Sequence, residues 1–220
     1  MSKKSTKLLD VIVIGAGASG MMAAITAARR GKSVAILERM NKPGKKILAT
    51  GNGKCNFTNN NMDTSRFHGN IQLIQSVLDR FSKEDTLSFF HEIGIWPKEK
   101  NGYYYPNSGQ AASVVEAFNH ELNRLHVPVY LEQEVLDLFP DKYGFRIKTV
   151  QTSYTCRNVI VASGLLAASK LGSDGSMFSV IKELGHRFVP VLPALCGFYA
   201  KGIPFSKVAG VRCDANLTLK

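Results

Sequence analysis

The chain has 220 residues, of which 45% are hydrophobic, and this suits one large domain or two small ones with a packed core. The four cysteines do not have the spacing of a zinc site, and no pair of histidines lies near them; they are Cys55, Cys156, Cys196 and Cys213. This argues against a structural zinc site and against a disulfide scaffold. A reducing cytoplasm is therefore the default location. The net charge of +11 is scattered rather than gathered in a basic face with interleaved aromatics, so it favours anionic cofactors and substrates over nucleic acid.

Residues 10–38 have the pattern of a strand, a glycine-rich turn, a helix and a second strand. A β-branched run at 11–14 is typical of a buried parallel strand; a helix is expected from about 18 to 30 and the next strand from 33 to 37. In such a turn the glycines permit a tight bend, close approach of a pyrophosphate, and close packing of the helix, whose free N–H groups favour phosphates. The candidate cofactor-binding residues here are Gly15, Ala16, Gly17, Ala18, Ser19 and Gly20.

An acidic residue follows the second strand. Glu38 lies 18 residues after Gly20, where its carboxylate can accept hydrogen bonds from the ribose hydroxyls of a dinucleotide. The glycine pattern alone is weak evidence, but together with the flanking strands and this acid it predicts a dinucleotide site.

The uncharged run at 11–28 also allows a membrane span or a signal peptide. Its three glycines, and Asp10 before it, argue against both, so no membrane span is expected.

Residues 41–60 form a second loop of the phosphate-binding type. Gly51 and Gly53 bracket Asn52, lysines precede and follow them, and amide and hydroxyl side chains come next. Such a loop offers closely spaced backbone N–H donors and cations to an anion. A solvated surface loop closed by asparagine turns is the alternative.

The rest of the chain predicts an α/β fold. A capping box at 82–85 opens a helix that runs to about 93 and carries His91 near its end, and a second helix is expected at 111–125. The tyrosines at 103–105 are either a packed loop or a stacking surface for a ligand. Strands are expected at 128–131, as a three-stranded meander at 135–139, 145–150 and 152–156, and as a buried parallel strand at 157–162. These elements predict a doubly wound, Rossmann-like parallel sheet with a three-stranded β-meander.

The run Gly-Lys-Lys-Ile-Leu-Ala-Thr-Gly-Asn-Gly-Lys-Cys-Asn-Phe-Thr-Asn at 44–59 resembles the signature of a bacterial flavoprotein family. Its members are described as aminoacetone oxidase-like, bile-acid 3-dehydro-4,6-reductase-like, or simply NAD(P)/FAD-dependent oxidoreductases. Residues 102–115 and 159–186 are similar to two further blocks of that family, so the resemblance extends along essentially the whole chain.

The resemblance implies FAD at the glycine-rich turn, a small-molecule substrate, and NAD(P)H as a candidate electron donor. Lys46 and the loop 50–56 would wrap the ribityl chain and approach the flavin ring, with Cys55 near it, although an unreactive buried thiol is the favoured reading of Cys55. Backbone near Val135 would read the adenine, and residues 162–164 would pass close to the cofactor. No catalytic acid or base is identified. The implied cofactor contacts beyond the turn are Glu38, Arg39, Lys46, Thr50, Gly51, Asn52, Gly53, Cys55, Asn56, Val135, Ala162, Ser163 and Gly164.

The chain departs from the family pattern in its third block. Leu165 stands where a glycine is usual and would be strained at positive φ, Ser169 stands where proline is common, and Met177 replaces a glycine and would crowd a close backbone approach.

Residues 1–192 are expected to be an FAD-binding domain, and 193–220 the beginning of an inserted second domain that is truncated. The sequence and the resemblance together predict an FAD-dependent oxidoreductase. An NAD(P)-binding reductase without flavin, in which Arg39 recognises a 2′-phosphate, and a non-catalytic binding module are the alternatives.

Overall fold

The computed structural model describes residues 8–193 and the single positions 207, 210, 211 and 216. The chain divides into two compact units, Met1–Val189 and Pro190–Lys220, and the fold described below is that of the first unit. Most of 193–220, the expected beginning of a second domain, lies outside the described residues. Within the described part, no helix is both long enough and apolar enough to cross a bilayer.

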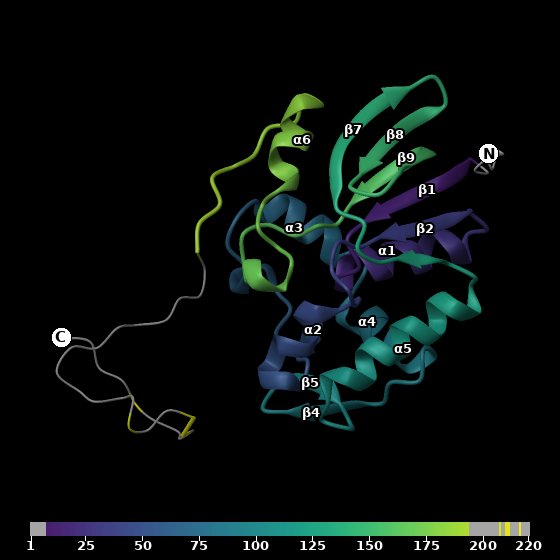
Figure 1. The fold of residues 1–220 in the computed structure, drawn as a ribbon. Coiled ribbons are helices and arrows are strands. Elements are labelled where there is room, and N and C mark those ends of the chain that lie inside the picture. Colours follow the sequence, from purple (N-terminus) through teal and green to yellow (C-terminus); the bar gives the residue numbers. More distant parts are fainter. Residues whose placement is uncertain (1–7, 194–206, 208–209, 212–215, 217–220) are drawn as a thin grey trace. The chain divides into compact units, whose positions relative to one another are not determined.

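The main sheet has six strands in the order β6-β2-β1-β9-β8-β7 (Figure 1). The first four strands are parallel to one another, and β8 pairs antiparallel with both β9 and β7. This confirms the α/β class, the parallel sheet and the meander that the sequence predicts. The bounds are β1 (Leu9–Ile14), β2 (Val34–Leu37), β6 (Val129–Tyr130), β7 (Val135–Asp141), β8 (Gly144–Thr149) and β9 (Ser153–Val161).

The meander and the parallel sheet share one continuous strand, which corrects the expectation of two separate strands at 152–156 and 157–162. The first half of β9 pairs antiparallel with β8 and the second half pairs parallel with β1, so Cys156 is a partner of both Phe145 and Leu9. The second half is also less buried than predicted, since Ile160 and Val161 are 36% and 37% exposed. No strand of the described residues pairs with 158–161 on the side away from β1, so these residues lack a neighbouring strand on that side.

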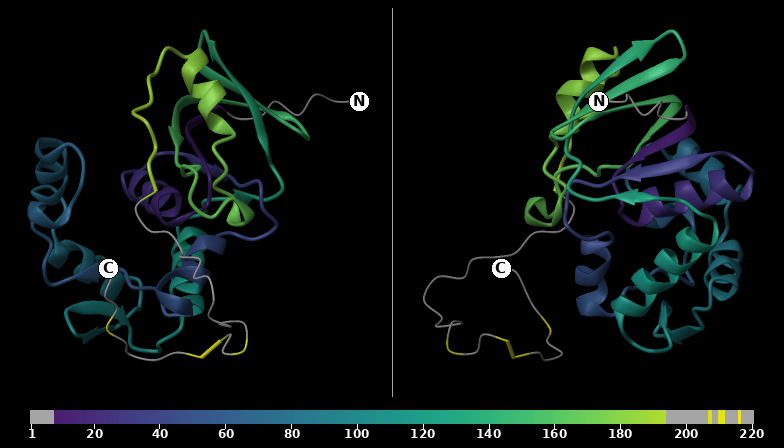
Figure 2. Two further views of the ribbon diagram at one scale, coloured as in Figure 1. Left: turned by 90° about the vertical axis from the view of Figure 1, so that its left-hand side faces the viewer. Right: turned by 45° about the vertical axis from the view of Figure 1, so that its right-hand side comes forward.

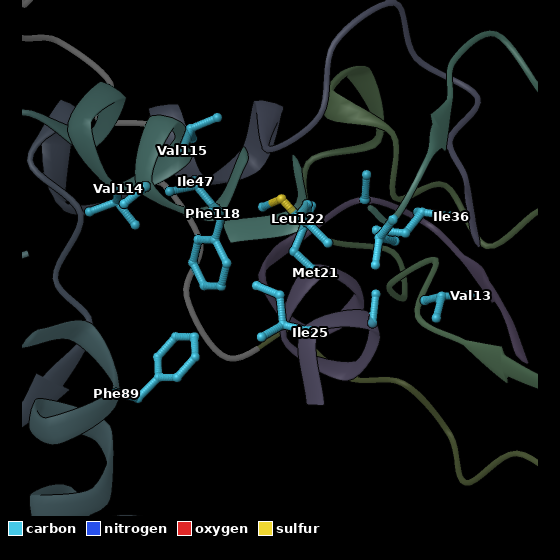
Figure 3. Close-up of a cluster of buried hydrophobic side chains, with 14 of the residues drawn as sticks. Val13, Met21, Ile25, Ile36, Ile47, Phe89, Val114, Val115, Phe118 and Leu122 are labelled. Atoms are coloured by element: carbon cyan, nitrogen blue, oxygen red, sulfur yellow. The ribbon is translucent and has the colours of Figure 1, made fainter. Parts of the chain in front are cut away.

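Helices cover one face of the sheet. The helices α1 (Ala18–Arg29) and α5 (Ala111–Arg124) pack together and against the strands through a continuous cluster of apolar side chains (Figure 3). The cluster includes Val13, Met21, Ile25, Ile36, Phe118 and Leu122. A second cluster on the other face joins β1, the meander and α6 (Met177–Glu183). The sheet therefore has a packed layer on both faces, as a doubly wound fold requires.

A small antiparallel sheet lies apart from the main one, with the order β3-β5-β4. Its hairpin joins β4 (Pro97–Lys100) to β5 (Tyr103–Pro106) through Asn101 and Gly102, which have φ of 54° and 84°. Two positive φ angles are what a two-residue type I′ turn requires, and Asn-Gly is its preferred sequence. The tyrosines at 103–105 are therefore a strand and not a loop, and this hairpin is an element that the sequence analysis missed.

The remaining elements connect these layers. The predicted capping box is confirmed: Ser82 and Asp85 exchange hydrogen bonds at the start of α4 (Lys83–Glu92). None of the residues of α3 (Ile71–Leu78) is buried, and Figure 2 shows this helix at the margin of the unit. The others are α2 (Lys45–Ala49), β3 (Thr58–Asn59) and the 3-10 turns η1 (Thr50–Gly53), η2 (Thr64–Arg66) and η3 (Ser169–Leu171).

Candidate dinucleotide-binding site

A cavity of about 340 Å³ lies at the carboxyl ends of β1 and β2. Ligands of open α/β sheets bind in this position, outside the carboxyl ends of the strands. The walls come from the turn after β1, the end of β2, α2, and the segments around 133–135, 162–164 and 171–177. Segments far apart in the sequence therefore meet at one site.

The three glycines of the first turn have different neighbours. Gly15 has φ of +102°, and a Cβ there would lie 2.7 Å from the carbonyl oxygen of Ala162. A Cβ on Gly20 would lie 1.9 Å from the carbonyl oxygen of Gly15, so no side chain fits between helix and turn. At Gly17 a Cβ would meet nothing within 4 Å, and this residue lines the cavity. Gly15 and Gly20 are thus required by the fold, whereas Gly17 leaves space open for a ligand.

The start of α1 is open to the cavity. Its N-cap, Gly17, supplies no side-chain cap, and Gly17, Ala18 and Ser19 all line the cavity wall. The first N–H groups of a helix have no partner within the helix, and its dipole places partial positive charge there. This end of α1 is suited to a phosphate group.

Glu38 connects the glycine turn to the end of β2. Its Oε2 accepts a hydrogen bond from the Ala16 N–H at 2.6 Å, and its Oε1 accepts one from the Met40 N–H at 2.8 Å. These bonds hold the carboxylate at the cavity wall in a fixed orientation. Each carboxylate oxygen has a second lone pair, so both can still accept a hydrogen bond from a ribose hydroxyl.

Two side-chain contacts tie residues 172–176, here called the clasp, to the cavity. Arg39 Nη1 donates to Asp174 Oδ2 at 2.7 Å, and Asp174 Oδ1 accepts from the Ser176 N–H at 3.1 Å. Lys46 Nζ donates to the hydroxyl of Ser173. The Arg39 guanidinium and the Ser176 hydrogen bond lower the pKa of Asp174 to about 2, so this carboxylate is ionised under ordinary conditions.

Most of the sequence-predicted residues meet at this cavity. Gly20 stands behind the turn as a packing position. The cavity wall includes Gly15, Ala16, Gly17, Ala18, Ser19, Glu38, Arg39, Lys46, Thr50, Val135, Ala162, Ser163 and Gly164.

The loop after Thr50 lies beyond this cavity wall. Gly51 and Asn52 line a different hollow, and the Asn56 amide donates to the carbonyl oxygens of Thr58 and Tyr104. Cys55 is buried in the first apolar cluster, and burial raises the pKa of its thiol, which favours the unreactive reading of this residue. Gly51, Asn52, Gly53, Cys55 and Asn56 remain predicted contacts of a flavin ring.

The structure decides one of the two concerns about the third block. Leu165 does not take a positive φ; the nearest left-handed residues are Gly164 at 79° and Ala168 at 61°. Met177 is the first residue of α6, packs into the second apolar cluster with 4% of its surface exposed, and also lines the dinucleotide cavity. That Met177 crowds a close backbone approach therefore stays a prediction.

Several cavity residues escaped the sequence analysis. Met40, Gln133 and Ser173 all line the cavity. No local pattern indicates the contact between Lys46 and Ser173, which are 127 positions apart. Residues 172–175 belong to the third family block, and their two glycines and one serine predict a turn but not the residues that the turn contacts.

Comparison with known protein families gives a match to the family described as "HI0933-like protein Rossmann domain", over residues 9–215. The chain is 45% identical over 208 residues to the 3-dehydro-bile acid delta(4,6)-reductase of Clostridium scindens, which covers 93% of this chain and 51% of that protein. It is 32% identical over 188 residues to the ribosomal RNA dihydrouridine synthase of Haemophilus influenzae, covering 83% and 46%. The chain thus spans about half the length of these relatives.

Solved structures share the fold at low sequence identity. A flavocytochrome c3 fumarate reductase in its open conformation superposes with a TM-score of 0.64 at 15% identity, over 82% of this chain and 41% of that one. A 3-ketosteroid-delta4-(5alpha)-dehydrogenase from Rhodococcus jostii gives a TM-score of 0.58 at 16% identity, over 76% and 48%. Both chains extend well beyond the matched region.

Proposed function

Because the chain belongs to the HI0933-like protein family, we propose that it is the FAD-binding part of a flavin-dependent oxidoreductase. The observation that carries this proposal is the open start of α1 with Glu38 held beside it at the end of β2. We further propose residues 1–192 as the FAD-binding domain and residues 193–220 as the beginning of a second domain. The cysteine usage supports a cytoplasmic location.

The cavity residues fit a dinucleotide with an adenosine end and a pyrophosphate. The N–H groups at the start of α1 would bind the pyrophosphate, and Gly17 leaves the space that it needs. Glu38 would accept hydrogen bonds from the adenosine ribose, and backbone near Val135 would contact the adenine. Lys46 would place a positive charge on the far side of the pyrophosphate, beside Ser163 and Gly164.

The same residues disfavour a phosphorylated ribose. The Glu38 carboxylate would repel a 2′-phosphate, and the neighbouring Arg39 guanidinium is already paired with Asp174. An NADP-type cofactor therefore fits the glycine turn less well than FAD does. NAD(P)H belongs to the proposal only as an electron donor that binds elsewhere.

We infer the reaction class from the two curated relatives. One is named a delta(4,6)-reductase and the other a dihydrouridine synthase, and both names describe the addition of hydrogen to a double bond. We propose the same class here: a hydride and a proton add across a carbon–carbon double bond, and NAD(P)H supplies the hydride equivalent. Bound flavin would carry the hydride, and the protein would bind and orient it.

Calorimetric titration of the purified chain tests the cofactor proposal. The apo-protein is titrated with FAD, FMN, NAD+ and NADPH in separate experiments. We expect FAD to bind most tightly, because FMN lacks the adenosine that Glu38 and Val135 would hold and NADPH carries the 2′-phosphate. Tighter binding of NAD+ or NADPH than of FAD would overturn the flavin proposal in favour of the reductase without flavin.

A further inference from the structure

A second hollow, of about 850 Å³, lies between the Gly51–Lys54 turn and the β4–β5 hairpin. It shares no residue with the dinucleotide cavity, but the two are neighbours along the chain, since Thr50 lines one and Gly51 lines the other. Small-molecule sites commonly have volumes of this order. Its lining includes Gly51, Asn52, Lys54, Lys98, Lys100, Tyr103 and Tyr105.

The hairpin contributes lysine and tyrosine side chains to the wall of this hollow. Lys98 is directly opposite Tyr105 in the antiparallel register, and Lys100 is opposite Tyr103. Opposed residues lie on the same face of a sheet and alternate residues share a face, so two lysines and two tyrosines form one surface. Glu99 belongs to the other face, and its carboxylate accepts a hydrogen bond from the Gly102 N–H.

The opposite wall is a turn in an unusual conformation. Gly51, Asn52 and Gly53 have φ of 54°, 58° and 80°, all left-handed. A Cβ on Gly51 would lie 2.7 Å from the Asn56 nitrogen, so only glycine fits against the backbone of its own loop, and it would lie at ordinary contact distance, 3.5 Å, from Cε1 of Tyr105. Left-handed residues other than glycine, such as Asn52, are costly and concentrate at ligand-binding sites.

The hollow is positively charged. Lys54, Lys98 and Lys100 are exposed, and none of them forms an ion pair with a carboxylate in the described part of the chain. Cations gathered on concave walls raise the local concentration of anions. Beside them the phenol rings offer flat apolar faces with polar edges.

We propose that this hollow binds the anionic part of a small-molecule substrate, namely a carboxylate or phosphate carried on a ring-bearing, flat body. The lysines would pair with the oxyanion, and Tyr103 and Tyr105 would pack against the rings. The proposal rests on the proposed function, because only a flavin in the neighbouring cavity makes this ligand a substrate. The size of the hollow and its three cations suit a small anion better than a nucleic-acid chain.

Direct binding of aromatic probes tests the site without any reference to flavin. The chain is titrated with 2-naphthoate, 2-naphthyl phosphate and 2-naphthalenemethanol, with amide chemical shifts recorded by NMR. We expect both anions to bind, the neutral alcohol to bind much more weakly, and the shift changes to map to 51–54 and 97–106. The tighter of the two anions identifies carboxylate or phosphate as the preferred group. Added salt should weaken both anions.

Matched charge variants locate the contact. The double variant Lys98→Ala, Lys100→Ala should weaken 2-naphthoate binding by roughly tenfold or more, since charge-assisted hydrogen bonds are lost. The control Lys142→Ala, Lys148→Ala removes the same charge from exposed positions on and beside β8 and should leave binding unchanged. Tyr103→Ser should weaken binding several-fold without altering its salt dependence.

Three results would overturn the inference: equal binding by the double variant and the control, equal binding of the neutral alcohol, or no binding of either anion. Far tighter binding of a single-stranded RNA oligonucleotide at the same residues would replace the small anion with nucleic acid. The FAD titration tests the proposed flavin function independently of the naphthoate titration. FAD binding without naphthoate binding removes only this inference, whereas naphthoate binding without FAD binding removes the proposed flavin function.

Discussion

Gly17 and Gly20 lie three residues apart at the start of α1, yet their substitutions should have opposite consequences. Gly17→Val adds a side chain where only open cavity lies, so we expect FAD binding to be lost while the fold and its thermal transition are kept. FAD titration and circular dichroism of the variant measure the two properties separately.

Gly20→Ala is the matched comparison. A Cβ at this position would overlap the Gly15 carbonyl, so we expect destabilisation by about 1–3 kcal/mol, the range for overpacked sites. If Gly17→Val retained FAD at wild-type affinity, the phosphate site would lie elsewhere than at the start of α1.

Glu38 should contribute to binding through its charge. We expect Glu38→Ala to weaken FAD binding by roughly 1–3 kcal/mol, because charge-assisted hydrogen bonds to the ribose are lost. The carboxylate also holds the Ala16 and Met40 N–H groups, so the melting temperature of the apo-protein is measured beside the dissociation constant.

Glu38→Gln keeps an acceptor oxygen but removes the charge, and it separates these contributions. We expect its FAD affinity to fall between those of the wild type and Glu38→Ala. An unchanged dissociation constant in Glu38→Ala would mean that this residue only supports the turn.

At the scale of elements, the clasp at 172–176 should carry a pH dependence through Asp174. Arg39 lowers the pKa of this carboxyl from its ordinary value of 3.8 to about 2 in the folded protein. The stabilisation is therefore complete above about 3.8, declines as the pH falls, and is lost below about 2. Because both side chains are partly exposed, salt should reduce the effect.

The variant Asp174→Asn tests this dependence. The difference in unfolding free energy between wild type and variant should shrink as the pH is lowered from about 5 to about 3. Asp141→Asn is the control, since Asp141 pairs with Arg146 at 3.4 Å in an exposed ion pair. A difference that stays constant over this range would show that the Arg39 contact does not stabilise the fold.

The elements also show where sequence patterns succeed and fail. The Asn101-Gly102 turn is a strong local signal for a hairpin, and the sequence analysis passed over it because three consecutive tyrosines do not alternate with polar residues. The two halves of β9 were read as separate strands because their hydrophobic patterns differ. The patterns differ because the first half pairs with the meander strand β8 and the second half with the parallel strand β1. A short stretch of sequence does not show which strands its residues will pair with.

At the scale of the whole molecule, we expect chains to associate through the edge of β9 at 158–161, which pairs with no second strand of the described residues. Unpaired strand edges template pairing with another chain, and Ile160 and Val161 place partly exposed apolar side chains there. We expect Ile160→Lys to reduce concentration-dependent association, because a charged side chain at a strand edge opposes pairing with another chain. The aliphatic part of the lysine still covers the apolar surface that Ile160 covers.

Sedimentation velocity over a range of concentrations measures this association. Ile160→Val is the control, since it keeps the apolar edge and should associate as the wild type does. Association that is equal in Ile160→Lys and the wild type would show that the chain pairs through another surface.

The sequence by itself determined the local features of this protein. The βαβ unit at the N-terminus, its three glycines, the acid at 38 and the capping box at 82 all follow from short-range rules of backbone conformation and periodicity. The family, and with it the expectation of FAD, follows from the run at 44–59. These properties depend on residues close in sequence, which is why they can be read without a structure.

Only the tertiary structure decided which distant residues meet. It placed Lys46 beside Ser173 and Arg39 beside Asp174, merged the meander with the parallel sheet in β9, and set the lysines of the hairpin opposite the Gly51–Lys54 turn. It also showed that Met177 packs into the core and that Leu165 avoids a positive φ. Such contacts depend on how strands and helices pack against one another, and packing is a property of the whole chain that no local pattern encodes.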